Sequence, residues 1–478
     1  MVCFMKVFLI VPPNLHYIAP YAYIEADKSN TIRPYLGLLY IAAAVKDIPG
    51  IDIRIVDANA DGLSMEELEK LITRESPDMV GFSVLTFNLL NCMAVSRIVR
   101  KCSPRTTICY GGWHPTLYPR ETLSFDFVDS IVIGEGELTF RELVTIYNKN
   151  KSPAEKELAV IKGIGFKTSD GHIIINPPRE VVKNLDDLPL PAYDLVDTTK
   201  YSNLLACSGQ AVTIMTSRGC PHRCVFCDLR RTAYRYRTSA NILGEIRFWV
   251  EKGVREFFIQ DDNFTINRKR TIEFCHLLTA ANLNIKYKIS SRVDCIDDEI
   301  CQYLKDSGCY RIYFGVESGS QKVLDYLEKG ITIQHIKTAF KAAHKHDIDC
   351  CAYIMIGVPS ETEEDIDLTM RLIKDIKPDH LHCSICTPMP KTYLYGKLME
   401  DGVIDRDYWL DFAVTPDPSF KTPFASQLYS AEELRRMQNT IQKQFYLNPR
   451  IVLHEILKTR GLKQFIAKSQ MALKMLFH

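Results

Sequence analysis

The stretch `RGCPHRCVFCD`, residues 218–228, places cysteines at positions 220, 224 and 227. It follows directly on an apolar run, `AVTIMTSR`, that is typical of a buried strand. Four thiolates in paired spacings would be typical of structural zinc. Three thiolates spaced C-x-x-x-C-x-x-C instead indicate a four-iron cluster in which one iron stays open to a small molecule. A zinc knuckle is the alternative reading of these residues alone.

Five further strand-like runs follow the cysteine stretch, and helical patterns separate them. Polar residues stand where the strands end, which is the end at which a parallel barrel carries its active site. The pattern predicts a partial (β/α)6 TIM-like barrel. Its six strand-like runs are residues 211–218, 256–264, 287–294, 311–318, 350–359 and 380–388.

The first 150 residues also alternate strand and helix patterns with short connections. Continuous apolar strands between amphipathic helices are typical of an α/β fold with a doubly wound, Rossmann-like parallel sheet. Ser64 and Glu67 have capping-box spacing before one of these helices. The strand-like runs are residues 6–13, 51–58, 78–86, 106–113 and 129–137.

The chain divides at the proline-bearing linker `NLDDLPLPAYDLV`, residues 184–196. We predict a ligand-binding domain over residues 1–150, a hairpin and linker over 151–200, and the barrel over 201–395. Residues 396–478 are predicted to form a helical C-terminal region, which turns basic after residue 450.

Bulk composition limits the function classes. The 478 residues are 46% hydrophobic and 24% charged with a net charge of +1, which gives no electrostatic reason to expect nucleic acid. No apolar run reaches the roughly 18–20 residues that span a bilayer. The 16 cysteines are mostly scattered singly in apolar segments, as in a reducing compartment. We therefore expect a cytoplasmic protein.

The cysteine spacing, together with the barrel pattern, resembles the radical SAM enzymes. In that family S-adenosylmethionine binds the open iron, and the resemblance implies a [4Fe-4S] cluster held by Cys220, Cys224 and Cys227. Phe226 stands where the family usually has an aromatic residue. The resemblance assigns the remaining S-adenosylmethionine contacts to strand ends, namely Asp261, Asp262, Ser291, Arg292 and Glu317.

The N-terminal half lacks a G-x-G-x-x-G after its first strand, so a dinucleotide is not expected. Its strand ends `GFSVLT`, `YGGWHP` and `IGEGE` resemble the cobalamin-binding branch of radical SAM enzymes. An ordinary flavodoxin-like domain is the alternative. The resemblance implies cobalamin contacts from Ser83, Leu85, Gly111, Gly112, His114, Gly134, Glu135, Gly136 and Glu137.

One motif of cobalamin domains is missing. The D-x-H-x-x-G sequence that supplies an axial histidine is absent after the first strand, and `DANADG` (57–62) has Asn59 in place of the histidine. We expect no axial histidine from that motif, and His16 is a weak alternative.

The resemblance implies a radical enzyme that modifies an unactivated carbon, with methyl transfer favoured. Oxidative cyclisation or ring rearrangement is the alternative, as in the anaerobic magnesium-protoporphyrin ester cyclases that the layout also resembles. A non-catalytic cobalamin-binding regulator is the alternative from another class. Expected partners are a small-molecule or lipid-like substrate and an electron donor of the flavodoxin or ferredoxin type, without nucleic acid.

Three further expectations concern the end of the barrel and the tail. Alternation in `DHLHCSICTP` puts His380, His382, Ser384 and Cys386 on one face, which makes His382 a candidate catalytic residue. Cys383 and Cys386 point apart in a strand, so only one cluster is expected. The basic, apolar tail is expected either to cap the barrel or to make a weak peripheral membrane contact.

Overall fold

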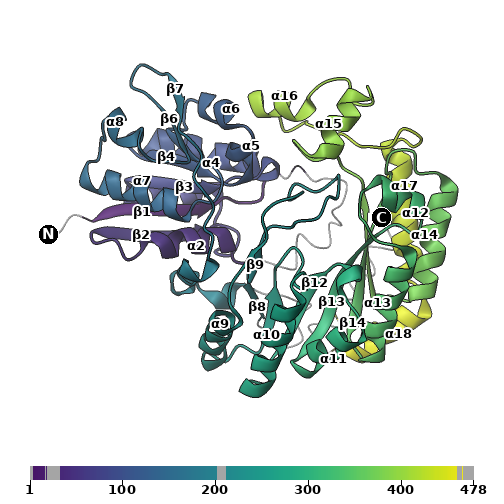
Figure 1. The fold of residues 1–478 in the computed structure, drawn as a ribbon. Helices are drawn as coiled ribbons and strands as arrows, with labels where there is room; N and C mark the ends of the chain where they lie inside the picture. The colour runs from purple at the N-terminus through teal and green to yellow at the C-terminus, as the bar shows by residue number, and fades with distance from the viewer. Residues whose placement is uncertain (1–3, 17, 19–32, 202–210, 460–465, 467–478) are drawn as a thin grey trace. The chain divides into compact units, whose positions relative to one another are not determined.

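The computed structural model describes residues 4–16, 18, 33–201, 211–459 and 466. They divide into two compact units, one built on a mostly parallel sheet and the other on a fully parallel sheet (Figure 1). The first unit contains residues 4–16, 18, 33–201 and 407–421, and the second contains 211–406 and 422–459. The predicted succession of two α/β architectures is confirmed.

The first unit carries a seven-stranded sheet in the order β2-β1-β3-β4-β5-β6-β7. Five strands are parallel and β6 and β7 are antiparallel to their neighbours. The order reverses between β1 and β3, and doubly wound sheets bind ligands at the carboxyl ends of strands near such a point. The strands are β1 (Met5–Val11), β2 (Ile51–Asp57), β3 (Met79–Ser83), β4 (Thr107–Gly111), β5 (Ser130–Val132), β6 (Ile164–Lys167) and β7 (Ile173–Ile175).

Helices cover both faces of this sheet, because its strands are apolar on both sides. Phe8 and Ile10 of β1 pack into a core with α3 and α4, whereas Val7 and Leu9 pack into a second core with α2 and α7. The predicted capping box of Ser64 is present at the start of α3. The helices are α2 (Leu36–Val45), α3 (Met65–Glu75), α4 (Leu89–Cys102), α5 (Trp113–Leu117), α6 (Pro119–Ser124), α7 (Glu137–Lys149) and α8 (Glu155–Leu158).

A segment distant in sequence completes the first unit. The sequence pattern assigns residues 407–421 to the C-terminal region, but α16 (Tyr408–Val414) belongs to this unit. The physical reason is aromatic packing. Phe412 lies in the core that β1 shares with α3 and α4, and Trp409 packs edge-on against Phe87 at 6.1 Å between ring centroids.

The second unit carries a six-stranded, fully parallel sheet in the order β8-β11-β12-β13-β14-β15. This is the predicted set of six strands. The strands are β8 (Ala211–Ile214), β11 (Glu256–Ile259), β12 (Lys286–Ser291), β13 (Cys309–Glu317), β14 (Asp349–Ile356) and β15 (His380–Ile385). The helices are α9 (Ser239–Glu251), α10 (Arg268–Ala281), α11 (Asp298–Asp306), α12 (Gln321–Tyr326), α13 (Ile333–Lys345), α14 (Glu363–Ile376) and α15 (Tyr393–Glu400).

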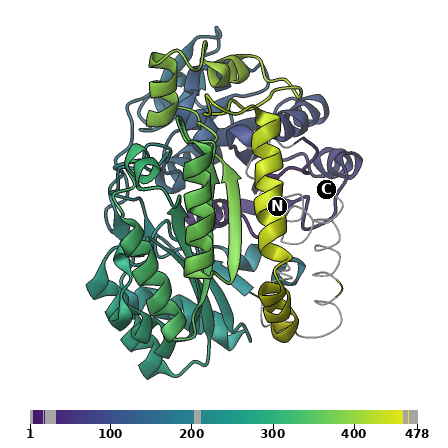
Figure 2. The ribbon, with the colours of Figure 1, turned by 90° about the vertical axis from the view of Figure 1, so that its right-hand side faces the viewer.

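The edge strand β15 is covered by the C-terminal helices α17 (Ala431–Tyr446) and α18 (Pro449–Lys458). Figure 2 shows α17 standing alongside β15. Gln438 and Tyr446 of α17 donate hydrogen bonds to the carbonyls of Cys383 (2.7 Å) and Leu381 (2.8 Å). Such contacts satisfy an otherwise open strand edge. Of the basic tail, the structure describes α18, whose Glu455 lies 3.4 Å from His380 of β15, whereas most of residues 460–478 lie outside the described residues.

Within the described residues, no helix is both long and apolar enough to span a bilayer. All 14 described cysteines are free.

Candidate active site

A small antiparallel ribbon closes the loop that carries the three cysteines. β9 (Ser217–Arg218) pairs with β10 (Arg235–Tyr236) on either side of it. Gly219 takes a φ of 84° immediately before the first cysteine, and a Cβ there would stand 2.3 Å from the Ala233 carbonyl oxygen. The Thr232 hydroxyl accepts a hydrogen bond from the Cys220 N–H at 2.9 Å. The loop is therefore fixed from both ends.

The three thiols differ in exposure. Cys224 is buried, and Cys220 and Cys227 are partly buried. Burial raises the pKa of the Cys227 thiol to about 12, so without a bound cation it stays protonated at neutral pH. The Arg292 guanidinium lies 3.8 Å from the Cys224 sulfur. A buried cation beside a sulfur favours the anionic form of a bound cluster or thiolate.

Arg292 holds the cysteine loop and the strand ends together. Its guanidinium makes a bidentate pair with Asp294, at 2.9 and 2.8 Å, and donates to the Lys329 carbonyl at 2.7 Å. The whole residue is only 6% exposed. Because protein groups accept most of its hydrogen bonds, the main role of Arg292 in this structure is to stabilise the segment beside Cys224. The expected contact with S-adenosylmethionine remains a prediction.

Glu317 ends β13 with a strained backbone and a buried ion pair. Its φ is 63°, and its carboxylate accepts from the Lys329 ammonium at 2.7 Å. The same ammonium lies 5.8 Å from the centroid of the Phe226 ring, inside the cysteine loop. A Cβ on Gly315 would stand 2.7 Å from both the Glu317 and Lys329 side chains. Glycine at 315 therefore makes room for this pair.

The adjacent carboxylates Asp261 and Asp262 have different surroundings. Asp261 is buried and accepts from the backbone N–H groups and hydroxyls of Thr216 and Ser217. It fixes the chain that leads into the cysteine loop. Asp262 keeps solvent access, although partial desolvation and the Asp261 carboxylate raise its pKa to about 6. Of the two carboxylates, Asp262 is the better placed to meet a ligand.

Ser291 is buried at the end of β12. Its hydroxyl shares a 2.5 Å hydrogen bond with Thr265 and lies 3.0 Å from the Arg292 carbonyl oxygen. These contacts tie the end of β12 to the loop after β11.

In the first unit, backbone hydrogen bonds join the loops after β3 and β4. The Val84 N–H donates to the Gly111 carbonyl at 2.7 Å, and the His114 N–H donates to the Val84 carbonyl at 3.0 Å. Gly112 has a φ of 100°, and a Cβ there would stand 2.8 Å from the Val84 oxygen. The small residues at 111 and 112 allow two backbones to approach at the carboxyl edge of the sheet.

The third predicted loop, after β5, joins the same edge. Thr116 donates to the Gly112 carbonyl at 2.7 Å and accepts from the Gly134 N–H at 2.9 Å. The Glu135 carboxylate accepts from the Val182 N–H at 3.3 Å. Gly136 packs closely on Ile41, since a Cβ there would stand 2.8 Å from that side chain. Glu137 is buried at the start of α7.

Two residues of this edge stand out. Leu85 is 38% exposed beside the partly buried Ser83. His114 is fully buried, with Nδ1 3.1 Å from the Thr86 hydroxyl and no hydrogen-bond partner for Nε2 among the described residues. Burial lowers the pKa of His114 to about 3, so its imidazole is neutral at physiological pH.

Asn59 has a structural position. Its amide donates to the Pro12 carbonyl at 2.9 Å and accepts from the Asn14 N–H at 3.0 Å, which clasps the loops after β1 and β2. His16 is exposed, and Asn91 holds its backbone through two hydrogen bonds. The positions of Asn59 and His16 therefore do not identify an axial ligand for the cobalt of cobalamin.

Comparison with known proteins decides the family. Residues 214–373 match the model of the radical SAM superfamily, and residues 26–144 match the B12 binding domain. An uncharacterized methyltransferase of Pyrococcus horikoshii is 31% identical over 462 residues, which is 96% of each chain. This chain belongs to the cobalamin-binding radical SAM family.

Two further similarities place this cobalamin-binding radical SAM enzyme among its relatives. The anaerobic magnesium-protoporphyrin IX monomethyl ester cyclase of Rubrivivax gelatinosus is 28% identical over 371 residues, 76% of this chain and 66% of the cyclase. The radical S-adenosylmethionine methyltransferase TsrM of Kitasatospora setae superimposes with a TM-score of 0.71 at 16% identity, over 94% of this chain and 90% of TsrM. At that identity TsrM supports the fold alone.

The residues of this radical SAM enzyme fit the cofactors of its family. Three free thiols on one rigid loop form a donor set for iron and sulfur, with Arg292 as a neighbouring positive charge. The exposed Leu85 and the glycine-bearing loops after β4 and β5 offer an apolar, close-approach surface for a large planar ligand. The fit concerns each unit separately.

Several site residues of this enzyme lack a sequence signal. Lys329 follows Glu317 by 12 positions in an ordinary helix–loop segment, and nothing in its neighbours marks it as buried. Thr216, Thr232 and Arg270 contact the cysteine loop or its approach through hydrogen bonds. Gly219 has a signal in retrospect, because a glycine adjoining the cysteines is where a positive φ is easily adopted.

The alternation predicted for β15 is present from His380 to Ile385, but it does not extend to Cys386. His380, His382 and Ser384 are partly exposed, whereas Leu381, Cys383 and Ile385 are buried. The His382 ring packs edge-on against Tyr353 at 5.3 Å. The strand ends at Ile385, so Cys386 lies beyond it and is fully buried. The single cluster expected for the chain remains a prediction.

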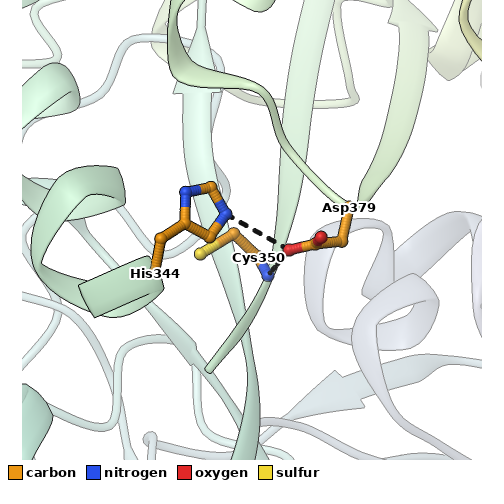
Figure 3. Close-up of side chains that lie close together, drawn as sticks. All are labelled: His344, Cys350 and Asp379. Carbon is orange, nitrogen blue, oxygen red and sulfur yellow. Dashed lines mark hydrogen bonds and ion pairs between the residues drawn. The ribbon is translucent and has the colours of Figure 1, made fainter. Parts of the chain in front are cut away.

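A separate cluster joins His344, Cys350 and Asp379 near the amino ends of β14 and β15 (Figure 3). Asp379 accepts from the Cys350 N–H at 2.9 Å and from His344 Nε2 at 3.2 Å. Burial opposes ionisation, but these two hydrogen bonds prevail and lower the pKa of Asp379 to about 2. The Cys350 thiol donates to the Ile348 carbonyl. The polar groups of this cluster therefore bond to one another and to the backbone, and the cluster stabilises the amino ends of β14 and β15.

Proposed function

We propose that this protein is a cobalamin-dependent radical SAM C-methyltransferase that acts on a small molecule. The observation that carries the proposal is the fixed three-cysteine loop at the carboxyl ends of a six-stranded parallel sheet, in one chain with a B12 binding domain. The 31% identity to a methyltransferase over almost the whole chain supports methyl transfer as the reaction.

Cys220, Cys224 and Cys227 would hold the cluster, and Phe226 with Asp262 would border S-adenosylmethionine. When bound, the cluster supplies the electron that splits S-adenosylmethionine into methionine and a 5′-deoxyadenosyl radical, and cobalamin supplies a transferable methyl group. Arg292 keeps positive charge beside Cys224, and the Lys329–Glu317 pair supports the strand end below Phe226. The protein contributes position and exclusion of water, and the cofactors contribute the reactivity.

In the first unit, the edge formed by the loops after β3, β4 and β5 would hold cobalamin. Ser83, Leu85, Gly111 and Gly112 would line its approach, and Gly134 to Glu137 would close the far side. His114 would act from below the surface, as a neutral buried imidazole that supports the loop after β4.

The test is anaerobic reconstitution with iron, sulfide and cobalamin, followed by turnover with S-adenosylmethionine labelled with deuterium in its methyl group. We expect 5′-deoxyadenosine and a product that is heavier by one labelled methyl group. Absence of 5′-deoxyadenosine under strong reduction would contradict the radical SAM assignment.

Oxidative cyclisation is the second candidate, supported by the similarity to the magnesium-protoporphyrin ester cyclase. The labelled experiment separates the two, because cyclisation produces 5′-deoxyadenosine without transfer of label to the product. A cobalamin-binding regulator would give neither.

Turnover needs electrons from outside the chain, and we propose a flavodoxin or ferredoxin as donor in the cytoplasm. The free thiols among the described cysteines support a reducing compartment. For a lipid-like substrate the basic tail would make a weak membrane contact. Co-sedimentation with anionic liposomes that is unchanged on deletion of residues 450–478 would remove that part of the proposal.

A further inference from the structure

One face of the second sheet carries a continuous set of aromatic side chains. Helices cover the other face, on which Phe314 packs against Phe340 of α13. Strand alternation explains the division, since neighbours of the aromatic residues along each strand are fully buried. The aromatic residues themselves are partly exposed, so solvent reaches this face. We name them the aromatic wall: Phe258, Tyr313, Tyr353 and His382.

The wall is continuous across four strands. Phe258 lies 6.0 Å from Tyr313 between ring centroids, and Tyr313 stacks on Tyr353 at 5.8 Å with an interplanar angle of 20°. His382 meets Tyr353 edge-on at 5.3 Å. Stacked and edge-on rings at these spacings form a stable apolar surface that suits a planar ligand.

Lys288 lies on β12, between Phe258 of β11 and Tyr313 of β13, and is only 2% exposed. Its ammonium lies 5.2 Å from the Phe258 centroid and 5.8 Å from the Tyr313 centroid. Within the described part of the chain it has no hydrogen-bond acceptor and no carboxylate partner. Cation–π contacts are worth about 0.5–2 kcal/mol, whereas burying an ammonium costs several kcal/mol.

Two other buried or half-buried cations of the second unit each have a carboxylate partner. Lys329 pairs with Glu317 at 2.7 Å, and Arg311 pairs with Asp349 at 3.4 Å. The contrast indicates that the charge of Lys288 is left for a ligand. Arg311 is the register neighbour of Lys288 on β13, but Asp349 engages its guanidinium, so Lys288 offers a single ammonium as a point charge for an anionic group such as a carboxylate.

We propose that Lys288 binds the carboxylate of the substrate, and that the aromatic wall holds the planar body of the same molecule. This assignment rests on the proposed function, because it concerns the substrate of that reaction. Lys288 precedes Arg292 by four residues, or roughly 13 Å of strand. The acid therefore lies toward the amino ends of the strands, and the reacting carbon is several bonds away, toward the cysteine loop.

The test is equilibrium binding by saturation-transfer NMR and calorimetry with 2-naphthoate and 2-naphthamide, which share a planar body and differ in charge. We expect the anaerobically reconstituted enzyme to bind naphthoate at least tenfold more tightly. Lys288→Met should abolish this preference, and Lys288→Arg should retain it. A wild-type enzyme without the preference, or a folded Lys288→Met enzyme that keeps it, overturns the proposal.

Lys252→Met is the matched control. Its ammonium also lies over an aromatic ring, 4.3 Å from the Phe248 centroid, but it is exposed on the surface of the second unit. This variant should bind both probes as the wild type does, and a lost preference here would overturn the assignment to Lys288. Because binding needs no turnover, failure of the proposed function would appear separately, as missing 5′-deoxyadenosine.

Discussion

The Lys329 ammonium lies 2.7 Å from the Glu317 carboxylate, and both side chains are buried at the end of β13. Glu317 has a positive φ, so its backbone is strained where its side chain is charged. The ion pair holds that conformation beside Phe226 of the cysteine loop. The pair thus links the stability of a strand end to the shape of the proposed cluster site.

Removing one partner of this pair is expected to destabilise the second unit strongly. Lys329→Met leaves the Glu317 carboxylate buried without its partner, which typically costs about 3–5 kcal/mol. Adding Glu317→Gln should restore much of the loss. Chemical unfolding monitored by circular dichroism measures both. Lys397→Met removes an exposed pair with Asp401 and should cost less than about 1 kcal/mol. Equal losses in the two single variants would contradict the assigned burial.

Gly219→Ala is expected to disrupt the cysteine loop without unfolding the sheet. The new Cβ meets the Ala233 carbonyl at 2.3 Å, in a backbone conformation that alanine adopts at a cost of about 1–2 kcal/mol. Iron per reconstituted chain should fall from about four to below one. In the control Gly244→Ala, within α9, a Cβ meets no atom within 4 Å, and alanine should stabilise the helix by up to about 1 kcal/mol. Full iron content in Gly219→Ala would refute the steric argument.

Cys224→Ala is expected to abolish formation of 5′-deoxyadenosine while cobalamin binding persists. The reason is that the thiols and the residues proposed to contact cobalamin belong to different compact units. Product analysis measures the loss of 5′-deoxyadenosine, and the visible spectrum of bound cobalamin measures the retained binding. Cys102→Ala, at a partly buried thiol of α4, is the control and should keep both. Continued cleavage in Cys224→Ala would remove Cys224 from the ligand set.

Periodicity predicted both sheets, because most strands read as apolar runs between amphipathic helices. It missed β9 and β10, since two residues are too few to show alternation. It also placed residues 407–421 in the wrong unit, because Trp409 packs against Phe87, 322 positions away, and Phe412 lies in the core of the first unit. Local pattern carries no information on such a contact.

The candidate site was predictable where chemistry imposes spacing, as with the three cysteines. Neighbouring residues of similar type were not separable. Asp261 and Asp262 cannot be told apart in the sequence. Only the structure shows that the Asp261 carboxylate accepts its hydrogen bonds from Thr216 and Ser217. In the sequence, Lys288 is an ordinary charged residue within a strand. Only the structure shows that the neighbouring strands surround its ammonium with aromatic rings and supply no carboxylate partner among the described residues.

His382→Gln is expected to lower product yield while S-adenosylmethionine cleavage continues. His382 is partly exposed and packs on Tyr353, so it contacts a molecule on the aromatic wall more readily than it supports the fold. The ratio of 5′-deoxyadenosine to product measures the uncoupling. His276→Gln is the control, since His276 packs edge-on against Tyr303 on the helical side, and its ratio should not change. A lowered melting temperature with unchanged coupling would instead give His382 a structural role.

Glu361 is expected to make stability depend on pH. It is 1% exposed in the loop after β14, and burial raises its pKa to about 7, although the Gly357 and Val358 N–H groups donate to it. The raised pKa means that the folded chain retains a proton that the unfolded chain releases. The stabilisation is therefore complete below about pH 4.5 and is lost as pH rises through about 7.

Glu361→Gln removes this titration and keeps an oxygen to accept from Gly357. The shift of the pKa from 4.5 to about 7 corresponds to about 3 kcal/mol. The stability of the variant relative to the wild type should therefore be higher at pH 8.5 than at pH 5.5, and at pH 8.5 the variant should be the more stable protein. Melting temperatures of both proteins between these values check it, because titrations common to the two cancel in the difference. Glu364→Gln, exposed on α14, should follow the wild type at every pH. Parallel curves for Glu361→Gln and wild type would show that Glu361 is ionised in the folded protein throughout this range.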